Sequence, residues 1–110
     1  MTTLPYRAVR GCVVVWLIVS SSLALADERA ERGRALLIDS CAQCHAVGRT
    51  GKSPFPSAPP FRAIGNRMDM DELMERMREG LSSGHRDMPM FRFSREDRRA
   101  IRSYLITIQE

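Results

Sequence analysis

The sequence has few of the side chains that form disulfide frameworks or zinc sites. Its 110 residues include three cysteines and two histidines. Cys12 lies in the apolar N-terminal stretch, which leaves Cys41 and Cys44, a pair too close together for a disulfide framework. A zinc site usually takes two pairs of ligands, and beyond the segment from Cys41 to His45 the usual nitrogen and sulfur donors of the mature chain are reduced to His85. These shortages argue against both kinds of stabilising site.

Strong charge, long apolar runs and strand patterns are also absent. The formal net charge is +4, and no concentrated basic patch accompanies groups that read or stack on bases, which argues against nucleic-acid binding. The N-terminal apolar run is interrupted by Ser20, Ser21 and Ser22 and is shorter than the ~20 residues that span a bilayer. Apolar residues recur with helical spacing, so we expect an all-α protein without internal repeats.

The first 26 residues have the pattern of a secretory signal peptide. Arg7 and Arg10 form a positive region, residues 13–19 begin the apolar region, and residues 24–26 give the small-x-small pattern of a cleavage site. The two arginines are not adjacent, so the signal is Sec-type rather than twin-arginine. We expect cleavage after position 26, with residues 27–110 as the mature domain; the alternative is an uncleaved membrane anchor.

The expected mature chain is small and nearly neutral. Without Arg7 and Arg10 it carries 15 basic and 13 acidic side chains. A domain of this size is marginal on apolar burial alone and usually needs an additional stabilising group. Since the cysteines do not form a framework, we expect that group to be something else.

Three stretches have apolar residues at helical spacing, over residues 28–38, over residues 70–80 and after Ser94. Ser94 is a favourable N-cap for the last of these, because Glu96 and Asp97 follow it in the first turn. These stretches predict three helices, with no strand between them.

Two loops rich in proline and glycine separate the predicted helices. Residues 48–60 contain four prolines, which exclude both helix and central strand. A loop of this length in a small domain normally serves a site. The second loop, residues 82–92, contains His85, Met88 and Pro89.

The segment Cys41-Ala42-Gln43-Cys44-His45 has the C-x-x-C-H pattern of covalent haem attachment. Two thiols three residues apart at a helix end can add to the two vinyl groups on one side of a porphyrin. His45 then lies under the iron as an axial ligand. The haem would also supply the apolar core that so small a chain lacks. We therefore predict one covalent haem c, with its iron, on Cys41, Cys44 and His45.

Three other kinds of site are less consistent with the cysteine pair. A zinc site lacks its second pair of ligands. A thioredoxin-like thiol pair is expected near a βαβ pattern, and none is present. A structural disulfide between Cys41 and Cys44 would be strained and would leave the small core unsupported.

The sixth iron ligand is predicted to be Met88. It precedes Pro89, whose restricted backbone can hold the loop against a haem, and a thioether ligand raises the reduction potential. Met90 is the second choice, and His85 would give a bis-histidine iron instead. The remaining methionines of the domain are interpreted as flexible apolar packing rather than a copper site: Met68, Met70, Met74 and Met77.

Several further residues accompany the haem motif. They are Gly33 eight positions before Cys41, Ala58-Pro59-Pro60-Phe61, Gly80, the segment G-H-R-D-M-P and Tyr104. With C-A-Q-C-H, they make the expected mature chain resemble a class I cytochrome c over nearly all of its length. The resemblance implies a cytochrome c fold whose first and last helices cross at Gly33 and Tyr104, which would explain a glycine in mid-helix.

The resemblance also implies which residues surround the haem. A proline carbonyl is expected to accept the free ring N–H of His45, and by position that proline is Pro59, with Pro60 as the alternative. Phe61 and Ile64 are expected to line a haem face.

The function expected from this set is one-electron transfer without bond-making chemistry. We expect a periplasmic, monomeric carrier that is not an enzyme and that exchanges electrons with redox partner proteins. The alternatives are a cytochrome subunit of a larger dehydrogenase or oxidase, and a haem enzyme or sensor with an open sixth position. A group of arginines is interpreted as a solvated helix face rather than a docking site for an acidic partner: Arg92, Arg95, Arg98, Arg99 and Arg102.

Overall fold

The computed structural model describes residues 6–80 and 89–110, with side chains from residue 22 onward within those ranges. The elements follow the order α1 (Tyr6–Cys41), the 3-10 helix η1 (Phe61–Asn66), α2 (Met70–Glu79) and α3 (Arg95–Ile108). No strand occurs in the described ranges. The predicted all-α fold class is therefore confirmed.

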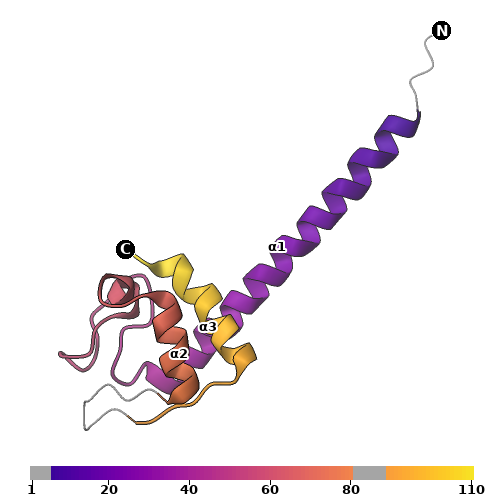
Figure 1. Cartoon of the computed structure of the whole chain (residues 1–110). Coiled ribbons are helices and arrows are strands. Elements are labelled where there is room, and N and C mark those ends of the chain that lie inside the picture. Colours follow the sequence, from indigo (N-terminus) through magenta and orange to yellow (C-terminus); the bar gives the residue numbers. More distant parts are fainter. Residues whose placement is uncertain (1–5, 81–88) are drawn as a thin grey trace.

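Helix α1 is much longer than the helix predicted over residues 28–38. It begins at Tyr6 and ends at Cys41, because no proline interrupts this stretch and its C-terminal part is rich in alanine, leucine, arginine and glutamate, which favour helix. Its N-terminal part extends away from the other elements (Figure 1). In the described part of the chain, no helix is both long and apolar enough to cross a membrane.

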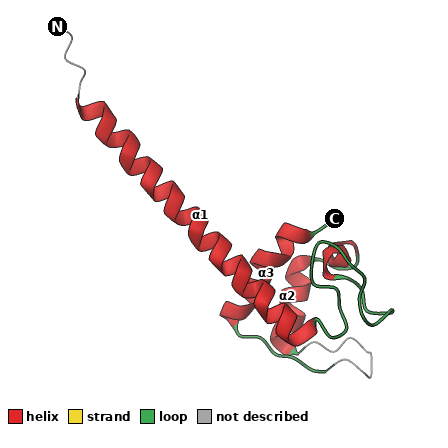
Figure 2. Cartoon of the chain, turned by 180° about the vertical axis from the view of Figure 1, so that it is seen from behind, coloured by secondary structure: helices red, strands yellow, loops and turns green. Residues whose placement is uncertain are grey.

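Helices α1 and α3 pack against each other through the C-terminal part of α1 (Figures 1 and 2). A Cβ atom added at Gly33 would lie 2.0 Å from the backbone oxygen of Ala100 and 2.8 Å from the backbone nitrogen of Ile101. The crossing predicted at Gly33 is therefore present. Its partner is Ala100 rather than Tyr104, because two backbones can approach this closely only where both side chains are small.

Helices α2 and α3 begin where the sequence predicted. The carboxylate of Asp69 accepts the backbone N–H of Asp71 at 2.8 Å at the start of α2. At the start of α3, the hydroxyl of Ser94 accepts the backbone N–H of Asp97 at 3.1 Å. Both side chains satisfy amides that a helix N-terminus leaves without partners.

The core is a single apolar cluster formed by all four elements and the segment that follows α1. Its buried members are Leu37, Cys41, Val47, Phe61, Ile64, Leu73, Met77, Ile101, Tyr104, Leu105 and Ile108. Met77 is fully buried, and Met68, Met70 and Met74 pack against the cluster. Their interpretation as packing residues is therefore confirmed.

The 3-10 helix η1 was not predicted. It has one turn of apolar spacing, from Phe61 to Ile64, which is too short for periodicity to reveal. It lies with the long loop that follows α1 on one side of the domain (Figure 2).

Candidate haem site

The C-x-x-C-H segment lies in a turn that closes the end of α1. The backbone oxygen of Cys41 accepts the N–H of Cys44 at 3.2 Å and the N–H of His45 at 2.9 Å. These two bonds bring the three predicted haem-binding residues together within one turn, at the point where the helix ends.

The loop over residues 48–60 is hydrogen bonded to the residues of this turn. The backbone oxygen of Cys44 accepts the N–H of Phe55 at 3.1 Å. The amide of Ala46 donates to the hydroxyl of Ser53 at 3.0 Å, and its carbonyl accepts the N–H of Phe61 at 3.0 Å. The loop is thereby held along the haem motif, as expected for a loop that serves a site.

The ring of His45 is oriented by the same loop. Its Nδ1 lies 2.8 Å from the backbone oxygen of Pro59; a carbonyl oxygen can only accept, so Nδ1 carries the proton. The ring centroid of Phe61 lies 5.0 Å from that of His45. With Nδ1 engaged as a donor, Nε2 is the nitrogen left to bind a metal. The hydrogen bond expected between His45 and Pro59 is present.

Helix α3 holds the segment that follows the motif through a hydrogen bond to Val47. The hydroxyl of Tyr104 donates to the backbone oxygen of Val47 at 3.0 Å, and both residues are buried. A buried carbonyl without a partner would cost free energy, so this bond stabilises the exit of the motif. Tyr104 therefore lies one turn after Ala100 on α3 and anchors the segment that leaves the haem motif.

Both thiols of the motif are free, and one of them is buried. Cys41 is 6 % exposed, and Cys44 is intermediate. Burial, with a smaller contribution from the neighbouring Cys44, raises the pKa of Cys41 to about 11. The Cys41 thiol is therefore neutral at pH 7.

The predicted sixth ligand lies outside the described residues. This holds for Met88 and also for His85, the bis-histidine alternative. Met90 is described and is 67 % exposed, with its side chain beside Gly80.

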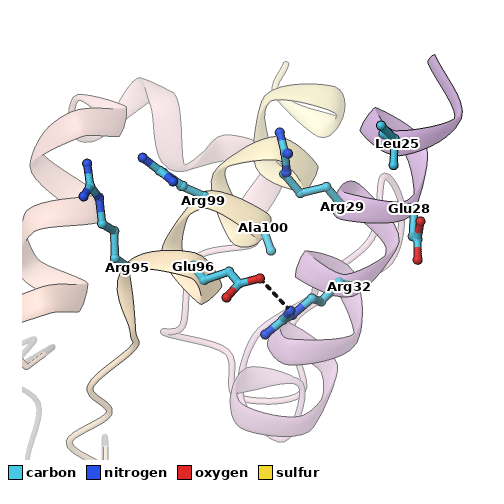
Figure 3. A pocket seen from close by; sticks show the side chains of 8 residues that line it. All are labelled: Leu25, Glu28, Arg29, Arg32, Arg95, Glu96, Arg99 and Ala100. Carbon is cyan, nitrogen blue, oxygen red and sulfur yellow. Dashed lines mark hydrogen bonds and ion pairs between the residues drawn. The ribbon is translucent and has the colours of Figure 1, made fainter. Parts of the chain in front are cut away.

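An open groove between α1 and α3 is not the haem site. It is lined by Leu25, Glu28, Arg29, Arg32, Arg95, Glu96, Arg99 and Ala100 (Figure 3). None of these side chains is a haem ligand, and Arg29 precedes Cys41 by 12 residues, which is about 18 Å along a helix. Arg32 is paired with Glu96 at 3.2 Å in this groove.

Two of the arginines considered for partner docking make contacts within the chain. Arg98 donates to the backbone oxygen of Phe93 at 2.8 Å, and Arg102 pairs with Asp71 at 3.3 Å. Both contacts occupy guanidinium groups that a docked partner would otherwise meet. They favour the interpretation of this helix face as solvated.

The donor set of the turn fits haem c better than a bare metal ion. Two free thiols and one imidazole with Nδ1 already engaged give a single iron-binding nitrogen, whereas the described residues contain no group of three or more Cys, His, Asp or Glu side chains placed for a metal. The apolar cluster that includes Cys41 and Phe61 provides a wall for a macrocycle.

The comparisons with known proteins agree with this geometry. The family described as cytochrome c oxidase, cbb3-type, subunit III matches residues 28–105, which include the haem motif and most of α3. Neither the curated proteins nor the solved structures gave a match. The chain therefore belongs to the cytochrome c oxidase, cbb3-type, subunit III family and is a small monohaem c-type cytochrome, an electron-transfer protein with covalently bound haem c and its iron.

Proposed function

We propose that the chain is an exported one-electron carrier whose iron is bound by His45 and Met88 and whose haem is attached through Cys41 and Cys44. The haem iron supplies the redox chemistry by alternating between its ferric and ferrous forms. The protein holds the ligands in place, excludes water from the iron and leaves one haem edge accessible to a partner.

The hydrogen bond from His45 Nδ1 to the backbone oxygen of Pro59 is the observation that carries this proposal. It selects the tautomer with Nε2 free, and the acceptor makes the ring a stronger electron donor to a bound metal. The apolar contact with Phe61 on the same ring reduces access of water. A histidine with only a structural role would have no need of a free, oriented Nε2.

The described residues on either side of positions 81–88 support a sixth ligand from the loop predicted over residues 82–92. The chain leaves α2 at Gly80, whose φ of 111° is readily adopted only by glycine. It returns at Phe93, whose N–H donates to the backbone oxygen of Met77 at 3.1 Å. Met77 belongs to the same cluster as Cys41, and Phe93 packs against that cluster, so the chain after the loop rejoins the core that carries the motif.

The N-terminal stretch supports export and removal of a leader. Leu23 and Leu25 are 64 % and 62 % exposed, so these apolar side chains do not pack on the domain. A stretch that contributes nothing to the core can be cleaved without loss of the fold. Haem c is attached outside the cytoplasm, which supports a periplasmic location for the mature carrier.

A second candidate function is a cytochrome subunit held in a larger oxidase. The description of the matched family, a subunit of a cbb3-type cytochrome c oxidase, favours it. Copurification with an enzyme complex would support this role, whereas a monomer in gel filtration would support a free carrier.

The proposal is tested first by visible spectra of the protein purified from the periplasm, oxidised and reduced, with a haem stain after denaturing electrophoresis. We expect covalent haem, a sharp reduced α-band and the weak long-wavelength ferric band of sulfur ligation. Covalent haem without the sulfur band would contradict His/Met ligation and favour bis-histidine or open coordination. Absence of covalent haem would overturn the proposal.

The choice of sulfur ligand is tested with Met88→Ala and the matched control Met90→Ala. We expect Met88→Ala to abolish the sulfur band and lower the reduction potential, because thioether ligation raises it. Met90→Ala should retain both, since its side chain is largely exposed. The reverse pattern would assign the ligand to Met90.

A further inference from the structure

Gln109, just beyond the end of α3, makes hydrogen bonds with every part of its amide. Its Nε2 donates to the backbone oxygens of Phe61 and Leu105, each at 3.0 Å. Its Oε1 accepts the backbone N–H of Gly65 at 2.8 Å. The one side chain therefore joins the C-terminal end of α3 to both ends of η1.

Neighbouring contacts fix the same segment. The backbone N–H of Glu110 donates to the oxygen of Arg62 at 3.1 Å, and Arg62 Nε donates to the Glu110 carboxylate at 2.8 Å. Arg62 also donates to the backbone oxygen of Gly51 at 2.9 Å. Helix η1 is thus tied to α3 and to the loop beside the haem motif.

Helix η1 in turn places the acceptor of the His45 ring. Phe61 begins η1 and is separated from Pro59 only by Pro60, whose φ of −65° is fixed by its ring. With so little freedom between them, the position of Phe61 determines where the Pro59 carbonyl points. That carbonyl accepts the Nδ1–H of His45 at 2.8 Å.

We propose that Gln109 is a positioning residue for His45: by holding η1, it keeps the Pro59 carbonyl aligned with the ring N–H and so adjusts the reduction potential of the iron. This inference rests on the proposed role of His45 as iron ligand. A well-aligned acceptor increases electron donation from the ring and stabilises the ferric state. Loosening η1 therefore raises the potential.

The test is Gln109→Glu in the haem-loaded protein. Glutamate has nearly the same shape and can still accept from Gly65, but it cannot donate to the Phe61 carbonyl. Removing a direct partner of a ligating histidine typically changes metal affinity by tenfold or more, and Gln109 acts one step further away. We therefore expect a rise of less than about 59 mV, the equivalent of tenfold for one electron.

Two further variants separate positioning from general destabilisation. Gly65→Ala is expected to raise the potential as well, because its Cβ would lie 2.9 Å from Gln109 Oε1 and displace that amide. Thr107→Ala is the control: it removes a 2.6 Å bond from the Thr107 hydroxyl to the backbone oxygen of Tyr104, near the same helix end, without touching η1. Its potential should equal that of the parent protein.

The second measurement is the exchange of the His45 Nδ1 proton with solvent, followed by NMR in the ¹⁵N-labelled ferrous protein. Faster exchange in Gln109→Glu and Gly65→Ala, but not in Thr107→Ala, supports the inference. If the parent protein has normal histidine ligation but Gln109→Glu and Gly65→Ala leave the reduction potential and the exchange rate unchanged, this inference is overturned while the proposed function stands. If the parent protein has no haem or no histidine ligation, both this inference and the proposed function are overturned.

Discussion

At the scale of single residues, Gly33 sets the distance between α1 and α3. The atoms nearest to an added Cβ belong to the backbone of Ala100 and Ile101, and backbone cannot rotate away as the end of a flexible side chain can. Gly48 offers a comparison within the same chain, because an added Cβ there would have no neighbour closer than 3.9 Å.

We predict that Gly33→Ala destabilises the protein by at least about 1–3 kcal/mol, the usual cost of forcing atoms into a packed interface. The methyl group must push the two helices apart. Gly48→Ala should leave stability within about 0.5 kcal/mol of the parent, as surface substitutions commonly do. Denaturant unfolding of both variants measures the difference, and equal stabilities would show that the crossing can relax.

Some residues of the site could be predicted from the sequence and others could not. Cys41, Cys44 and His45 were found because the chemistry of haem attachment requires their local spacing. Pro59 was found only through family resemblance, since it lies 14 positions from His45. Gln109 had no signal at all, because a polar residue after a helix resembles any solvated one.

At the scale of elements, the start of α3 is held by a small polar network. The carboxylate of Asp97 accepts from the Ser94 hydroxyl at 2.7 Å and pairs with Arg32 of α1 at 2.9 Å. The Ser94 hydroxyl lowers the pKa of Asp97, and Arg32 lowers it further. The network therefore joins the cap of one helix to the side of another.

We predict that Asp97→Asn destabilises the protein at pH 7 and has a smaller effect in acid. A carboxyl whose folded-state pKa is lowered contributes stability above its unfolded value of about 3.9 and loses it as the pH falls through the folded value. Unfolding at pH 7 and at about pH 2 measures this, with exposed Asp39→Asn as control. A difference that persists unchanged in acid would show that charge is not the cause.

The elements were predictable where their signals are local. Helix α2 was found from its apolar spacing and α3 from its Ser94 cap and apolar spacing, and the structure begins them at Met70 and Arg95. The full extent of α1 was not predicted, because only residues 28–38 had one-sided spacing. Helix η1 was missed because its two short turns are stabilised by contacts with residues far along the chain.

At the scale of the whole molecule, the stability of the packed domain does not depend on the apolar side chains Leu23 and Leu25. Leu23 and Leu25 are exposed, whereas the core includes Leu37 and extends to Ile108. Apolar burial is the main stabilising contribution to a small domain, and the two apolar side chains Leu23 and Leu25 are not members of the buried core.

We predict that a chain beginning at Asp27, exported by a host leader, has the same spectra and melting temperature as the full-length chain. The reason is that no core contact is removed. Visible spectra and thermal unfolding of the two chains provide the measurement. A large loss of stability in the shorter chain would mean that residues before Asp27 pack on the domain.

The sequence by itself determined the helical class, the start of the last helix at Ser94 and the haem-attachment chemistry, because all of these depend on residues within a few positions of one another. The tertiary structure alone decided that Ala100 faces Gly33, that the Pro59 carbonyl meets the ring of His45, and that Gln109 holds η1. Each of these pairs is separated by many residues, so its contact exists only once the helices have packed.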